Sequence, residues 1–265
     1  MGTQVRSISQ TGATEPFELQ VARGQIEGHK HQFKFGHNAL VSNTEETIWA
    51  QGGIYAYPPG AQQMTLSSSS DNDTANEGTG ARTVEISGLD ADYNEQSETL
   101  LLNGQTPVTT TKSFLRTFRM RVLTAGDGLF NQGTIYLGTG TVTAGVPAVK
   151  YATIDGFGDN QTMMCLWTVP AGYTAFLLQS NISTGNGSST PAVLRTRLIS
   201  RPHGETFQTK ERITMTDGNQ LQNYSIPLRF EEKTDIEFRA VSSTNVDFDV
   251  SASMEFVYIK NPGGL

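Results

Sequence analysis

The stretch Val246–Tyr258 reads VDFDVSASMEFVY, and apolar or small residues occupy every second position in it. Because a β-strand turns successive side chains to opposite faces, this alternation predicts a long strand with one face on a core. The other face carries Asp247, Asp249, Ser251, Ser253 and Glu255. It is therefore expected to meet water or a polar partner.

Similar segments recur at intervals of roughly ten residues, with turn residues and no helical pattern between them. The predicted strands are residues 17–22, 63–66, 82–87, 97–102, 107–111, 114–123, 134–137, 163–169, 173–180, 193–200, 212–216, 226–230 and 235–241. Asn103-Gly104 predicts a tight hairpin turn, because both of these residue types accept positive φ. The high content of Gly, Thr, Ser and Asn also favours strands and turns over helices.

The sequence thus predicts an all-β fold of two antiparallel β-sandwich or jelly-roll-like domains with long loops. We expect a polar N-terminal arm at residues 1–15, a first β domain at 16–157 and a second, jelly-roll-like sandwich at 158–265. The boundary is expected near residues 155–161, which hold two glycines and little apolar content. The polar tract 67–80 is expected to form an exposed loop.

Charge and cysteine content narrow the classes of partner. The 265-residue chain has a formal net charge of -7, and its basic residues are scattered, which argues against general nucleic-acid binding. Cys165 stands alone and the first residues lack a signal-peptide layout, so we expect folding in a reducing cytosol. No apolar run is long enough for a membrane span, and the chain is expected to be soluble.

Motifs for catalysis are missing from the sequence, so we expect a protein that is not an enzyme and that uses no cofactor. Cys165 lies in an apolar segment and is interpreted as a small core residue. Metal binding is an alternative at one histidine group and two acidic groups, although solvated turns and faces are the favoured interpretation. These groups are His29, His31 and His37; Asp71, Asp73 and Glu77; and Asp90, Asp92, Asn94 and Glu95.

Two sets of residues are candidates for a protein interface. Arginines on outward strand faces can make bidentate contacts with an acidic neighbour, although cross-strand pairing with Glu is the commoner role. The candidates are Arg116, Arg119, Arg121, Arg195 and Arg197, with Arg201 nearby. Trp49, Tyr55 and Tyr57 could form an aromatic platform for a glycan, although core or subunit contacts are the favoured interpretation.

Three segments together resemble structural proteins of tailed bacteriophages, particularly those of marine phages and cyanophages. They are ARGQIEGHKHQFKFGHN at 22–38, GTGARTVEISGLDADYNEQSETLLLNGQTPVTTTKSFLRTFRM at 78–120 and TVPAGYTAFLLQ at 168–179. The similarity covers most of residues 20–180 and, more loosely, the final strands. No residue-level binding motif is carried over by it.

The resemblance implies a β-sandwich virion component, either a capsid decoration (cement) protein or a tail, neck or adaptor protein. Cement proteins of this kind are often homotrimers that staple adjacent major capsid protein subunits. The leading hypothesis is therefore a cement protein on the capsid surface, bound to the major capsid protein through its N-terminal part and to its own copies through flat sheet faces. A carbohydrate-active or lectin-like sandwich that acts on the host surface, such as a host-glycan-binding appendage, is the alternative from another class.

Overall fold

The computed structural model describes residues 15–156, 158–186, 188 and 190–262, and the regular secondary structure in this part of the chain is almost entirely β-strand. All of its strand pairs are antiparallel, so the predicted all-β class is confirmed. The predicted arm falls largely on residues 1–14, which lie outside the described residues. None of the described helical segments has the length and apolar character needed to cross a membrane.

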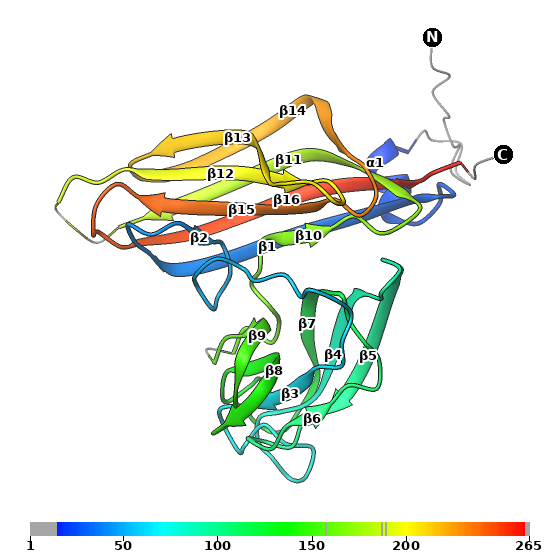
Figure 1. Ribbon diagram of the computed structural model, residues 1–265, viewed down its shortest axis with the longest axis vertical. Coiled ribbons are helices and arrows are strands. Elements are labelled where there is room, and N and C mark those ends of the chain that lie inside the picture. Colours follow the sequence, from blue (N-terminus) through cyan, green and yellow to red (C-terminus); the bar gives the residue numbers. More distant parts are fainter. Residues whose placement is uncertain (1–14, 157, 187, 189, 263–265) are drawn as a thin grey trace.

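Two sheets pack face to face and form the part we call the sandwich (Figure 1). The first sheet has the order β1 (His29–Val41), β16 (Phe248–Lys260), β11 (Tyr173–Gly185) and β14 (Gly218–Phe230). The second has the order β10 (Leu166–Thr168), β15 (Asp235–Ser242), β12 (Leu194–Arg201) and β13 (Gln208–Met215), with β2 (Glu46–Thr47) paired to β15. Their inner faces share one core, which includes Trp167, Phe238 and Phe256.

The chain between β2 and β10 forms a second body, the inserted module, which Figure 1 shows below the sandwich. One of its sheets has the order β6 (Val108–Thr109), β3 (Thr65–Ser68), β8 (Ile135–Thr143) and β9 (Val146–Ile154). The other has the order β5 (Glu95–Leu101), β4 (Ala81–Leu89) and β7 (Arg116–Ala125). Both sheets contribute to a separate core that includes Leu66, Ile86 and Met120.

Strand pairing differs from the predicted division of the chain at 157. β1 pairs with β16 along almost its whole length, and β2 pairs with β15, so residues 29–47 belong with the C-terminal strands. The module is an insertion into the sandwich rather than the first of two consecutive domains. β1 also lies close to the chain that leads into β10, since a Cβ atom at Gly36 would lie 2.3 Å from the backbone nitrogen of Cys165.

The predicted strand at residues 17–22 is wrong, because Phe17–Ala22 forms the short helix α1. Pro16 precedes the helix, and Gly24 follows it with φ of +67°, which are the usual start and stop signals. Gln20 and Val21 are the residues that α1 buries.

The predicted hairpin at Asn103-Gly104 is also wrong. β5 pairs with β4, whereas β6 pairs with β3, so the two strands that flank the dipeptide never pair with each other. Gly104 has φ of +58° but Asn103 has no positive φ, and a type I′ turn needs positive φ at both positions. The Gly104 nitrogen instead donates to the Asp73 carbonyl at 2.9 Å.

The polar tract 67–80, expected to be an exposed loop, is organised around a buried carboxylate. Asp73 is fully buried and accepts hydrogen bonds from the Ser68 hydroxyl at 2.6 Å and the Ala81 nitrogen at 2.8 Å. The nitrogens of Gln132 and Gly133 donate to the same carboxylate at 2.8 and 2.9 Å. This tract therefore contributes to the interior of the module rather than only to its surface.

Candidate functional site

The junction between module and sandwich holds the first of the predicted interface arginines. Arg116 on β7 donates to the Asp235 carboxylate on β15 through Nε at 2.9 Å and through a terminal nitrogen at 3.2 Å. Asp235 also accepts from Arg201 at 2.6 Å and from the Thr168 hydroxyl at 2.6 Å. Burial alone would lower the pKa of Arg116, but the hydrogen bonds and charge of Asp235 raise it. Arg116 is thus a joint between the two bodies and not a free surface cation.

Four further contacts join the module to the sandwich. The Glu95 carboxylate on β5 lies 2.5 Å from the Lys30 amine and accepts from the Tyr258 hydroxyl at 2.9 Å. Arg119 donates to the Phe33 carbonyl at 3.2 Å. The fully buried Lys34 amine donates to the carbonyl of Phe118 on β7, and burial holds the pKa of this amine well below its usual range.

The three predicted platform aromatics pack inward instead of forming an exposed surface. Trp49 is 4% exposed and Tyr55 2% exposed. Their rings stack edge to face at 5.1 Å, and Tyr55 stacks in the same way on Tyr57 at 4.8 Å. Tyr57 is in turn covered by the guanidinium groups of Arg116 at 5.0 Å and Arg201 at 4.7 Å. Stacking and cation–π contacts therefore occupy the faces that a sugar would need.

The outer face of the second sandwich sheet carries the other predicted arginines. Arg197 on β12 lies directly opposite Arg239 on β15 and Arg212 on β13, so three arginines form one row across adjacent strands. Like charges in direct register destabilise a sheet unless they have counter-charges. Arg195 lies two residues from Arg197 on the same face. We call Arg195, Arg197, Arg212 and Arg239 the arginine face.

Counter-charges cover only part of the arginine face. Glu45 pairs with Arg197 and lies 3.6 Å from Arg239, and Glu237 pairs with Arg239. Burial raises the pKa of Glu237 to about 7, against the lowering effect of Arg239. Arg195 and Arg212 are exposed and form no ion pair with any described residue. This half of the face offers free guanidinium groups to an acidic partner.

Sequence reasoning found Arg195 and Arg197 but missed Arg212, Arg239 and Glu237. The spacing of Arg195 and Arg197 shows that they share a strand face. Which residues lie opposite depends on strand register, and no feature of the sequence sets that register. Arg121, another predicted residue, pairs with Glu85 across strands at 2.5 Å and remains 57% exposed.

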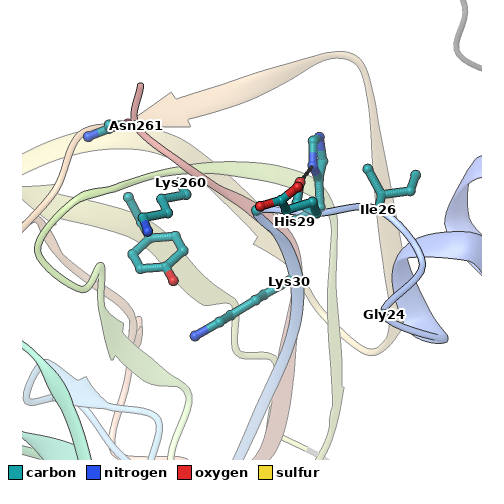
Figure 2. A pocket seen from close by; sticks show the side chains of 9 residues that line it. Gly24, Ile26, His29, Lys30, Lys260 and Asn261 are labelled. Atoms are coloured by element: carbon teal, nitrogen blue, oxygen red, sulfur yellow. Dashed lines mark hydrogen bonds between the residues drawn. The ribbon is translucent and has the colours of Figure 1, made fainter. Parts of the chain in front are cut away.

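An open cavity of about 570 Å³ lies at the end of the sandwich, between β1 and the chain that follows β16 (Figure 2). Ile26 and His29 border one side of it, and Lys260 and Asn261 border the other. Lys30 extends along the cavity, with its amine 4.9 Å from the centre of the Tyr173 ring. The lining is mixed in polarity and contains no nucleophile paired with a base.

The candidate metal groups are held by other contacts. Among the described residues, no group of three or more His, Cys, Asp and Glu side chains converges on a metal position. His37 lies 2.7 Å from Asp249 and His31 lies 3.3 Å from Glu255, whereas His29 packs against Phe17. Asp90 caps its own turn by accepting from the nitrogens of Asp92 and Asn94, at 2.9 and 2.8 Å. Cys165 is buried, which raises its pKa and agrees with a core role.

Comparison with known proteins gives no match to a family model and none to a curated protein. Similar solved structures include the infectious bursal disease virus Gx strain, at 10% identity and a TM-score of 0.25 over 89% of this chain and 73% of that one. Empty top-component particles of cowpea mosaic virus align at 6% identity and a TM-score of 0.20, over 77% and 83% of the two chains. The VP2 subviral particle of infectious bursal disease virus aligns at 9% identity and a TM-score of 0.21, over 94% and 83%. TM-scores this low do not establish a shared fold.

Proposed function

We propose that this chain is a structural component of a tailed-bacteriophage virion that decorates and stabilises the mature capsid by binding the major capsid protein. The observation that carries the proposal is the rigid attachment of the module to the sandwich. A staple between neighbouring subunits works only if its contact surfaces keep a fixed separation. Two buried contacts and two exposed ones hold these two bodies together. The sequence resemblance to structural proteins of tailed bacteriophages supports the assignment to a phage particle.

We further infer that the sandwich is a jelly roll. Its strands pair as a long hairpin rolled into two layers: β1 with β16, β2 and β10 with β15, β11 with β14, and β12 with β13. This is the double Greek-key pattern of jelly rolls, which are common in viral capsid proteins. The inserted module interrupts the second strand position of the roll, between β2 and β10.

We assign one surface of this chain to each of its two predicted partners. The major capsid protein is bound through the N-terminal part, which ends at the cavity formed by Ile26, His29 and Lys260. Copies of this chain meet through a flat sheet face, for which the arginine face is our candidate, and together they form a homotrimer. The role is non-enzymatic, and many weak contacts made by repeated copies would add up on a capsid lattice.

An electron-microscopy map of intact particles tests the proposal. We expect density for the sandwich and module at lattice-related positions on the capsid surface, and loss of the protein should lower the temperature that capsids survive. Density confined to the tail vertex would instead identify a tail, neck or adaptor protein. Binding to host polysaccharide in a glycan array, without binding to capsids, would favour the host-recognition alternative.

A further inference from the structure

We propose that residues 126–133, the loop between β7 and β8, dock on the arginine face of a second copy of this chain. We call this segment the β7–β8 loop. The inference rests on the proposed function, because it names the surface that meets the arginine face in the self-contact. It concerns a segment that none of the sequence patterns singled out.

The tip of the β7–β8 loop exposes two large apolar side chains. Leu129 is 79% exposed and Phe130 is 45% exposed. Acidic residues surround this pair: Asp127 precedes it and is exposed, and Asp159 is exposed beside Gly158, whose Cβ position would lie 3.0 Å from the Phe130 ring. An apolar centre with a charged rim is the usual composition of a protein contact surface.

Leu129 is held in an unfavourable backbone conformation. Its φ is +63°, in the left-handed region that costs free energy for any residue with a bulky side chain. Within the monomer the exposed side chain gains no burial that would offset this cost. Glycine would fit the backbone better, so leucine at this position indicates a use for its side chain outside the monomer.

The loop is rigid enough to present these side chains in one arrangement. The nitrogens of Gly126 and Gly128 donate to the carbonyls of Gly80 and Thr79, each at 2.8 Å. Asn131 is fully buried, and its nitrogen donates to the Asn160 side chain at 3.1 Å. The carboxylate of Asp73 accepts hydrogen bonds from the backbone nitrogens of Gln132 and Gly133. A preorganised surface loses little conformational entropy on binding.

The arginine face complements this loop in charge and in chemistry. The chain as a whole carries a formal charge of -7, yet Arg195 and Arg212 stand on the arginine face without an ion-pair partner among the described residues. Asp127 and Asp159 would supply the missing counter-charges. An aromatic ring also packs well on a guanidinium group, as Phe207 already does on Arg201 at 4.6 Å.

The two surfaces are different patches of one chain, so the contact is head to tail. Such heterologous contacts give closed rings when the rotation between copies closes. A ring of three copies is the form that agrees with the proposed homotrimer.

Sedimentation of the purified full chain over a range of concentrations tests the contact. Leu129→Gly should weaken self-association by about tenfold or more, because it removes a central apolar contact. At concentrations where both chains are monomeric it should leave the fold intact, because glycine accepts the positive φ. Leu40→Ser is the matched control, since Leu40 is 66% exposed on β1 of the sandwich and should leave association unchanged. A wild-type chain that remains monomeric at all concentrations would overturn the proposal, as would a Leu129→Gly variant that associates normally.

Charge inversion gives a second, independent test. The variants Asp127→Lys/Asp159→Lys and Arg195→Glu/Arg212→Glu should each self-associate poorly, because like charges then face each other. Mixing the two preparations should give open complexes that contain both variants, since each inverted surface meets its complement in the other variant. A ring of three copies cannot alternate two variants, so the mixture should associate without closing the ring. Failure of the mixture to associate would count against this pairing.

Capsid binding separates this inference from the proposed function. If wild-type chains bind capsids at lattice positions but mixing restores nothing, the docking is wrong and the function stands. If mixing restores association but no capsid is bound, the docking stands and the proposed function is wrong.

Discussion

Asp235 on β15 accepts a hydrogen bond from Arg116 Nε on β7 at 2.9 Å, and both side chains are almost completely buried where the module meets the sandwich. The same carboxylate accepts from Arg201 of the sandwich. One acidic group therefore binds cations from both bodies, and the relative position of the bodies depends on it. A buried charge network of this kind is costly to break, because the remaining partners stay buried.

Replacing Asp235 with Asn should therefore be strongly destabilising. We expect a loss of about 3–5 kcal/mol in the free energy of unfolding, since Arg116 would keep its charge without a counter-charge. Glu85→Gln is the matched control, because it breaks the exposed pair with Arg121 and should cost less than about 1 kcal/mol. Urea titration of the variants measures both values. Equal losses would show that the Arg116–Asp235 pair does not hold the bodies together.

Glu237 predicts a dependence of stability on pH. Its pKa is raised from 4.5 to about 7 by burial in the folded chain, so the folded state binds more protons than the unfolded state between these values. The contribution of Glu237 to stability is therefore fully present below about pH 4.5 and is lost as the pH rises through about 7. Over that window it amounts to on the order of 3 kcal/mol.

Glu237→Gln removes this contribution, and melting temperatures measured between pH 4.5 and 8 test it. The wild type should lose stability relative to the variant as the pH rises from 4.5 to about 7. A difference that stays constant with pH would contradict the raised pKa.

The alternation at Val246–Tyr258 predicted its strand correctly, because β16 buries Phe248, Val250 and Met254 while Asp249 and Ser251 face outward. β1 follows the same geometry but could not be recognised. Its inward side chains include Lys34 and Asn38, whereas Phe33 faces outward and is 44% exposed. Alternation of apolar and polar residues indicates a strand only when the inward residues are apolar. At Lys34 the inward residue is a lysine, because its amine donates to a backbone carbonyl of the module.

For the candidate site, the sequence predicts only which residues share a face of one strand. Arg195 and Arg197 share a face by their spacing, but Arg212 joins them through the register between β12 and β13, which includes a bulge at Leu198/Ile199. Arg116 looked like a surface residue because its burial partner, Asp235, is 119 positions away in the sequence. Contacts of such long range are fixed by the whole fold and have no local signature.

Asp73 gives a prediction about the module interior. Asp73→Ala should cost about 3 kcal/mol or more, because it leaves two buried backbone nitrogens, one part-buried backbone nitrogen and the Ser68 hydroxyl without their acceptor. Asp71→Ala, in the same tract, removes one exposed hydrogen bond to the Gln105 nitrogen and should cost less than about 1 kcal/mol. Thermal unfolding of both variants measures the contrast. Similar melting temperatures for the two would mean that the tract is the exposed loop that its composition suggests.

Lys34 predicts a dependence of stability on pH that is opposite in sign to that of Glu237. Its pKa lies well below 10.5 because the amine is fully buried, so the unfolded chain binds the proton more readily than the folded chain. The penalty of burying Lys34 therefore falls, and stability rises, as the pH increases toward 10.5.

Lys34→Met keeps the apolar stem and removes the amine, so the variant should be more stable than the wild type at neutral pH, by about 1–3 kcal/mol. That advantage should shrink at higher pH, and Lys30→Met, which changes a half-exposed lysine on the same strand, should show no such trend. A Lys34→Met variant less stable than the wild type across the whole pH range would show that the bond to the Phe118 carbonyl outweighs the cost of burying the amine.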